Sequence, residues 1–239
     1  MTLDGERDSQ DHTAELTSRY GGLSGAALLR PMIEKVFAGR IAVVSSFGAE
    51  SAVILNLVAR IDPTTPVLFL DTRKHFAETL AYRETLVAQL GLADLRVIGP
   101  DPVAVAEQDP EGWLWQRAPE NCCHLRKVLP LRRALAGFEA WITGRKHFQS
   151  GLRAGLRPIE AVEGRIKINP LADWSVKEVA AAFKSADLPR HPLVDKGYAS
   201  IGCAPCTRPV GSGNPARAGR WAWTGKTECG IHGPAQAQP

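Results

Sequence analysis

The chain has 239 residues, of which 44% are hydrophobic, enough for one sizeable α/β core and too few for two enzyme domains. Its formal net charge of +4 suits a site for a small anion and is too small for a non-specific nucleic-acid binder. No long apolar run occurs and the first residues are polar, so we predict no membrane segment, no secretion and a cytoplasmic location.

The N-terminal part, residues 1–20, is rich in charged side chains and is predicted to be a disordered lead-in. After it, helical and strand-like apolar patterns alternate. We expect helices over 23–36, 52–61, 77–90, 122–135 and 175–184, and strands over 41–44, 67–70, 95–98, 141–143 and 166–168. This alternation predicts an α/β fold with a doubly wound, mostly parallel sheet over 21–206, followed by a mobile C-terminal tail, 207–239, rich in glycine and proline.

A serine-rich loop, Ser45-Ser46-Phe47-Gly48, follows the first predicted strand. Hydroxyls and backbone N–H groups at the start of a helix bind oxyanions, which favours a phosphate site, although the same string also suits an ordinary helix cap. The second predicted strand ends in Leu70-Asp71-Thr72, at the same carboxyl edge, where sheets of this type bind ligands. The two loops together indicate a nucleotide site that lacks the Walker pattern.

Five cysteines divide into two close pairs and one single residue. Cys122-Cys123 and Cys203-Ala204-Pro205-Cys206 supply four thiolates, enough to close a tetrahedral metal site. Zinc, buried apolar thiols and disulfides are the alternatives, and disulfides fit poorly because the count is odd and the predicted compartment is reducing. The pattern therefore favours metal ligation by four cysteines and a reactive fifth thiol.

The fifth cysteine, Cys229, lies in the tail within Lys226-Thr227-Glu228-Cys229-Gly230-Ile231-His232. Lys226 and His232 favour the thiolate, whereas Glu228 opposes it. From its position alone, Cys229 is either an exposed nucleophile that attacks and withdraws or an incidental tail residue. Trp221 and Trp223, in the same tail, are interpreted as packing residues.

Together these residues resemble the assimilatory adenylyl-sulfate reductases, relatives of the phosphoadenylyl-sulfate reductases. That family shares the adenine nucleotide alpha hydrolase-like fold of the PP-loop ATP pyrophosphatases. The resemblance covers most of residues 42–232. Its motifs are SSFGAE at 45–50, LDT at 70–72, the Cys122-Cys123 pair, TG at 143–144, IGCAPCTRP at 201–209 and ECGIH at 228–232. The last two motifs are highly specific.

The resemblance implies thioredoxin-dependent reduction of adenosine 5′-phosphosulfate to sulfite and AMP, through an enzyme S-sulfocysteine, in assimilatory sulfate reduction and cysteine biosynthesis. It implies a [4Fe–4S] cluster on Cys122, Cys123, Cys203 and Cys206, with Cys229 as the nucleophile. Thioredoxin or glutaredoxin would then release sulfite. The sequence does not determine the oligomeric state, and a homo-oligomer is possible. The substrate-binding residues implied by the resemblance are Ser45, Ser46, Phe47, Gly48, Asp71, Thr72, Lys127, Gly144, Arg153, Arg217 and Arg220.

Arginine suits sulfate and phosphate oxygens because its guanidinium donates two parallel hydrogen bonds. Arg217 and Arg220 either share one helical face or form a solvated turn. All four paired cysteines are typical of the adenylyl-sulfate branch, although some cluster-bearing relatives also accept the 3′-phosphorylated substrate. Two departures from the family pattern stand out. Arg73 replaces a usual glycine, and residues 146–150 carry fewer basic side chains than in many relatives.

Two other classes of function compete with this reading. A tRNA-modifying PP-loop enzyme would use ATP, and it predicts a Ser-Gly-Gly-x-Asp-Ser loop and a broad basic surface, neither of which is evident in the sequence. A non-enzymatic iron–sulfur or zinc regulator that binds a nucleotide needs the paired cysteines but not Cys229. Replacement of Cys229 by serine separates the regulator from the enzyme.

Overall fold

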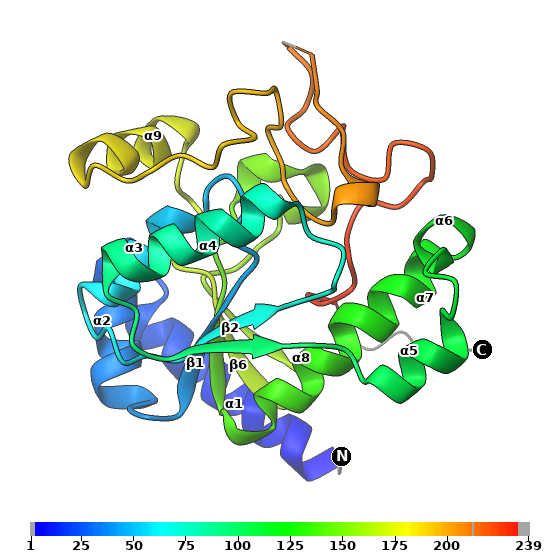
Figure 1. Cartoon of the computed structure of the whole chain (residues 1–239). Coiled ribbons are helices and arrows are strands. Elements are labelled where there is room, and N and C mark those ends of the chain that lie inside the picture. The colour runs from blue at the N-terminus through cyan, green and yellow to red at the C-terminus, as the bar shows by residue number, and fades with distance from the viewer. Residues whose placement is uncertain (1–2, 212, 234–239) are drawn as a thin grey trace.

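A six-stranded sheet forms the centre of the chain in a computed structural model, which describes residues 3–211 and 213–233 (Figure 1). The strand order is β3-β2-β1-β4-β6-β5, and every neighbouring pair is parallel except β5 and β6. The strands are β1 (Ile41–Ser45), β2 (Val67–Leu70), β3 (Leu95–Ile98), β4 (Ala140–Ile142), β5 (Ile159–Val162) and β6 (Arg165–Ile168). The predicted doubly wound, mostly parallel sheet is confirmed.

Helices link the strands and cover both faces of the sheet (Figure 1). They are α1 (Leu3–Tyr20), α2 (Gly25–Pro31), α3 (Ser51–Ala59), α4 (Ala77–Leu90), α5 (Pro102–Gln108), α6 (Leu114–Arg117), α7 (Pro119–Cys123), α8 (Leu129–Ala134) and α9 (Val176–Ser185). Two π-helical turns, Met32–Val36 and His124–Val128, adjoin α2 and α8. Short 3₁₀ turns are formed by Leu135–Gly137, His147–Gln149, Gly151–Arg153 and Ala204–Cys206.

Two apolar cores lie on opposite faces of the sheet, because successive strand side chains point to opposite sides. Val43 and Phe69 belong to the larger core, which α2, α3, α4 and α9 complete. Leu68 and Trp141 belong to the smaller core, where they pack against Leu131 of α8. A fully buried side chain of this size contributes about 1.5–3 kcal/mol to stability. Packing on both faces fixes the strand ends that carry the candidate site.

The N-terminal segment differs from the prediction. Residues 3–20 form α1, which packs against β5 and β6, so the predicted disordered lead-in is wrong for this range; residues 1–2 lie outside the described part. The helix forms because residues at four-residue spacing give it a narrow face that packs on the rest of the fold. Leu16 is buried in the larger core, Tyr20 packs against that core, and the His12 ring lies 5.9 Å from the ring of Phe37. Composition alone hides this face among charged residues.

The described residues of the C-terminal segment, 189–211 and 213–233, contain little regular structure and lie beside the sheet edge (Figure 1). It includes the predicted tail 207–239, of which residues 212 and 234–239 lie outside the described residues. An isolated bridge pairs His75 with Cys203, and Ala204 N donates to the carbonyl of Lys74. These bonds fasten the segment to the loop after β2. Among the described residues, no helix is long and apolar enough to cross a membrane.

Candidate active site

A cleft opens at the carboxyl ends of β1, β2 and β4, the edge at which sheets of this kind bind ligands. Its walls come from the loop after β1, the loop after β4 and the C-terminal segment. The predicted residues that line it are Ser45, Ser46, Gly48, Lys127, Gly144, Arg153, Arg217, Arg220 and Cys229. Segments far apart in the sequence therefore meet at one edge of the sheet.

The serine-rich loop forms the floor of the cleft before α3 begins at Ser51. The Ser45 hydroxyl accepts a hydrogen bond from the N–H of Phe47 at 3.2 Å, which tightens the turn. A side chain at Gly48 would meet the carbonyl oxygen of Ile201 at 3.1 Å, so close backbone packing explains this glycine. Phe47 itself is fully buried against Phe69 and does not line the cleft.

The loop after β2 takes a different place from the one expected. Asp71 accepts a hydrogen bond from the N–H of Arg73 and does not line the cleft. The Thr72 hydroxyl lies 3.3 Å from the sulfur of Cys203, within the neighbouring cysteine cavity. Arg73 has a φ of 59°, in the left-handed region that favours glycine. Thr72 therefore supports the cysteine region, whereas His75 of the same loop lines the cleft.

Lys127 and Arg220 line the cleft without a salt bridge to any carboxylate among the described residues. The guanidinium of Arg220 lies 4.4 Å above the ring of the buried Trp221. Nε of Arg220 is buried and has no hydrogen-bond partner. A buried donor without a partner is costly, so these cations suit an anionic ligand.

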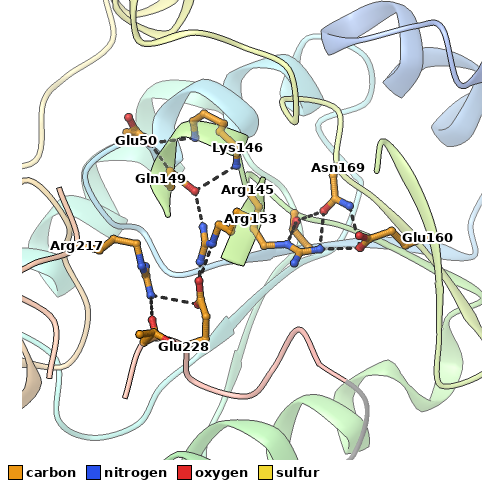
Figure 2. A network of polar contacts seen from close by, with 11 residues as sticks. Glu50, Arg145, Lys146, Gln149, Arg153, Glu160, Asn169, Arg217 and Glu228 are labelled. Carbon is orange, nitrogen blue, oxygen red and sulfur yellow. Dashed lines mark hydrogen bonds and ion pairs between the residues drawn. The ribbon is translucent and has the colours of Figure 1, made fainter. Parts of the chain in front are cut away.

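Arg153 and Arg217 converge on one carboxylate, that of Glu228 (Figure 2). Arg153 donates from Nε and Nη2 at 2.7 and 2.9 Å, and Arg217 donates from Nη2 at 3.1 Å. Burial alone raises the pKa of the Glu228 carboxyl, but the hydrogen bonds and charges of the two arginines outweigh it and lower this pKa. Burial also lowers the pKa of Arg217 to about 10. Glu228 is therefore ionised at neutral pH.

A second group of polar contacts ties the loop after β1 to Arg153 (Figure 2). The amide nitrogen of Gln149 donates to Glu50 at 2.7 Å, and its amide oxygen accepts from Arg153. Lys146, almost fully buried, pairs with Glu50 at 3.0 Å and donates to the carbonyl of Gly144 at 2.8 Å. A continuous chain of contacts thus runs from Glu50 through Gln149 and Arg153 to Glu228.

A third group of polar contacts holds the tail at His232. Arg145 pairs with Glu160 at 2.7 Å, and Glu160 also lies 3.3 Å from the buried Lys167. Burial lowers the pKa of Lys167 to about 8. Lys167 donates to the carbonyl of His232 at 3.0 Å. The His232 ring stacks on the Trp141 ring, with 5.7 Å between the ring centroids. The segment that follows Cys229 is therefore anchored on the sheet.

The four paired cysteines are all buried and line one small cavity beside the cleft. All five cysteine thiols are free of disulfides. Burial raises the pKa of Cys122 and Cys206 to about 11 and that of Cys123 to about 12. Lys127 lines both the cavity and the cleft, so one cation adjoins both sites.

Cys203 differs from the other three paired cysteines. Its burial favours a raised pKa, but the charge of Lys127 and the hydrogen bond from Thr72 outweigh burial and lower the pKa of Cys203.

No three His, Cys, Asp or Glu side chains of the described chain converge closely enough to hold a single metal ion. The four sulfurs surround a cavity instead of meeting at one point.

Cys229 is half-buried and lines the cleft, where it packs against the buried cluster of Cys123, Cys203, Cys206 and Trp221. Gly230 follows it with a φ of 83°, which turns the chain back toward the sheet. Cys229 therefore lies between the basic residues and the cysteine cavity.

A family model described as "Phosphoadenosine phosphosulfate reductase domain" matches residues 40–209. The chain belongs to this family. A protein of Mesorhizobium japonicum named adenosine 5′-phosphosulfate reductase is 52% identical, over 92% of this chain and 86% of the relative. A protein of Gloeobacter violaceus named phosphoadenosine 5′-phosphosulfate reductase is 40% identical, over 91% of this chain and 92% of the relative.

A solved structure has the same fold as this member of the reductase family. It is the phosphoadenylyl-sulfate reductase of Candida auris, in a phosphate complex, with a TM-score of 0.71 and 28% identity. The match covers 83% of this chain and 97% of that structure. The fold that the resemblance implied is thereby confirmed.

Several side chains line the cleft of this reductase-family member that were not predicted to bind substrate. They are Glu50, Arg145, Lys146, Gln149, Glu228 and His232. Three of them follow the Thr143-Gly144 motif at the end of β4, two lie in the ECGIH motif, and Glu50 ends the SSFGAE motif. Position within or beside a motif was therefore the signal, because polar residues near a strand end face the same edge as the motif.

Proposed function

We propose that this chain reduces adenosine 5′-phosphosulfate to sulfite and AMP in assimilatory sulfate reduction, with a dithiol protein such as thioredoxin or glutaredoxin as reductant. The observation that carries the proposal is the position of Cys229, whose thiol lines the same cleft as Lys127, Arg217 and Arg220. A soft nucleophile beside several cations suits attack on an activated sulfate. Membership of the reductase family supports the same substrate class.

Substrate binding follows from the charge of the cleft. Lys127 and Arg220 have no carboxylate partner within the described chain, so they are free to neutralise the phosphate and sulfate groups. The turn at Ser45–Gly48, before α3, offers hydroxyls to the nucleotide. These groups would hold the sulfur atom within reach of Cys229.

The chemical step balances without an electron from the protein. The Cys229 thiolate attacks the sulfur of the sulfate group, an S–S bond forms, the bond from sulfur to the bridging oxygen breaks, and AMP leaves with that bond's electron pair. Lys127 and Arg220 stabilise the charge that develops on the leaving phosphate. One thiol of the reductant then attacks the sulfur of Cys229, a mixed disulfide forms, and the S–S bond to the SO₃ group breaks so that sulfite leaves with its electron pair. The second thiol of the reductant attacks this mixed disulfide, closes a disulfide in the reductant and releases the Cys229 thiolate.

Four buried cysteines around one cavity fit a multi-atom iron–sulfur cluster better than a single zinc ion. Zinc needs four ligands within about 2.3 Å of one point, and no such convergence of three ligands occurs among the described side chains. Cys122, Cys123, Cys203 and Cys206 would hold the [4Fe–4S] cluster. When bound, the cluster supplies structural and electrostatic support to the site. Lys127 would neutralise part of its charge from the cleft side.

An anaerobic assay tests the function directly. Purified protein with a dithiol donor should release sulfite from adenosine 5′-phosphosulfate, and the Cys229→Ser variant should release none while it retains its iron. Retained iron with unchanged function in that variant would favour a nucleotide-binding regulator. The 40% identical relative named for the phosphorylated substrate makes the 3′-phosphate analogue the second arm of the assay.

The reductant and the location are part of the same proposal. Five free thiols suit a reducing cytoplasm, where thioredoxin and glutaredoxin operate. Replacement of the dithiol donor by a monothiol protein variant should trap a mixed complex with Cys229. Absence of any trapped complex with either reductant would contradict this part of the proposal.

A further inference from the structure

The charges that line the cleft are mostly paired. Of the cations, Lys146 pairs with Glu50, Arg145 pairs with Glu160, and two arginines share Glu228. Glu160 lies behind the cleft, so Glu50 and Glu228 are the carboxylates among the described lining residues. Glu50 belongs to the first loop of the sheet, whereas Glu228 belongs to the tail. Glu228 is thus the carboxylate that reaches the cations of the cleft from a separate segment.

Glu228 satisfies the two arginines in the way that an anionic ligand would. Arg153 holds it at two points, and Arg217 donates both to its carboxylate and to the carbonyl of Thr227 at 2.8 Å. Two parallel N–H···O contacts are the geometry with which arginine binds carboxylate, sulfate or phosphate. One donor, Nε of Arg217, stays buried without a partner. The site therefore holds more donor capacity than Glu228 uses.

Glu228 directly precedes Cys229 in the chain, so the contacts of its carboxylate hold the backbone next to the nucleophile. The tail has a second ion pair outside the cleft, between Lys226 and the exposed Glu120. On the other side, Lys167 and Trp141 anchor His232 on the sheet. Residues 227–230 are thus a short bridge between two fixed points, and Glu228 is its attachment to the cleft.

We propose that Glu228 is a positioning residue that occupies Arg153 and Arg217 in place of an anionic group of the substrate. Binding of the phosphosulfate takes over these arginines, releases Glu228 and frees Cys229 to approach the sulfur. This inference rests on the function proposed above, since it assigns the sequence of events at that site. An anion too weakly charged to displace Glu228 would not free Cys229 to approach the sulfur.

The test compares Glu228→Gln with the matched control Glu120→Gln. Both variants remove one carboxylate that contacts the tail, but only Glu228 contacts the cleft arginines. Affinities for AMP and for inorganic sulfate are measured by calorimetry, at low and high salt. We expect Glu228→Gln to bind both anions about tenfold more tightly, equivalent to about 1.4 kcal/mol, because it no longer competes for the arginines. Glu120→Gln should bind them as the unchanged protein does.

Alkylation of Cys229 supplies a second measurement, which needs no variant. In the unchanged protein, saturating inorganic sulfate should accelerate iodoacetamide labelling of the peptide that contains Cys229. In Glu228→Gln, labelling should be fast without sulfate. Unchanged or weaker anion binding by Glu228→Gln, or slower labelling of the unchanged protein with sulfate, would overturn the inference. Neither readout needs turnover, so a failure to reduce sulfonucleotides would be seen separately.

Discussion

The carboxylate of Glu228 makes a two-point ion pair with the guanidinium of Arg153, at 2.7 Å from Nε and 2.9 Å from Nη2. The two residues are 75 positions apart, and the pair joins the loop after β4 to the segment that carries Cys229. The pair is largely shielded from solvent, which strengthens it relative to a surface ion pair. Folding of the loop and placement of the nucleophile are thereby linked.

Loss of one paired cysteine should remove the iron. We expect Cys203→Ser to lose most of its iron and its visible absorption, because three remaining thiolates leave one coordination position open. Iron analysis and absorption spectra of anaerobically purified protein make the measurement, with Cys229→Ser as the control that keeps both. A full iron content in Cys203→Ser would show that the four cysteines are not the ligand set.

Gly202→Ala should impair the site through Arg220. A Cβ at Gly202 would overlap the guanidinium of Arg220, whereas a Cβ at Gly225, in the same segment, meets nothing within 4 Å. Since displacement of a clamping group by about 1 Å can cost about 100-fold in rate, we expect kcat/KM for the sulfonucleotide to fall by about 10- to 100-fold. Gly225→Ala should retain full activity. Normal activity in Gly202→Ala with normal iron content would show that Arg220 does not hold the substrate.

The strands and most helices could be predicted because buried β-strands and amphipathic helices have distinct apolar periods. The edge strand β5 was missed, although Glu163 and Gly164 both have positive φ and form the tight turn that joins it to β6. Helix α5 was also missed, despite the cap by Asp101 and the proline after it. Short elements carry too few residues for a period to show.

The candidate site was predictable only as far as its motifs reach. The cysteines and the serine-rich loop were named from sequence, and the structure brings them to one edge of the sheet. The side on which Phe47 points, and the partnership of Gln149 with Arg153, depend on tertiary packing between distant segments. No local pattern encodes such contacts.

Arg73→Gly should stabilise the fold. The φ of 59° at Arg73 costs a non-glycine residue about 1–2 kcal/mol, and the greater freedom of glycine in the unfolded chain offsets part of the gain. We expect a net increase of about 0.5–1 kcal/mol in the free energy of unfolding. The matched control Arg60→Gly, at a φ of −72°, should destabilise the protein. Urea unfolding of both variants measures the difference, and a less stable Arg73→Gly would contradict the strain argument.

His191 should make stability depend on pH. It is fully buried, its Nδ1 accepts from the N–H of Leu193 at 3.1 Å, and its Nε2 lies 3.0 Å from the Thr79 hydroxyl. Burial lowers the pKa of His191 to about 4, against an ordinary value of 6.5. Between these values the unfolded chain binds more protons, so stability is complete above pH 6.5 and falls as the pH approaches 4.

The loss attributable to His191 should be on the order of 3 kcal/mol across that range. The variant His191→Asn lacks the titration and keeps an acceptor for the N–H of Leu193. Its free energy of unfolding should therefore change less with pH than that of the unchanged protein. Parallel pH profiles for the two proteins would show that His191 is not the group responsible.

In the proposed reaction, Cys229 attacks the sulfur of a sulfonucleotide bound in the cleft. Anaerobic protein incubated with adenosine 5′-phosphosulfate, without any thiol reductant, should gain the mass of one SO₃ group, and peptide mapping should place it on Cys229. AMP should be released in equal amount. An adduct on another cysteine, or AMP release with no adduct, would show that Cys229 is not the nucleophile.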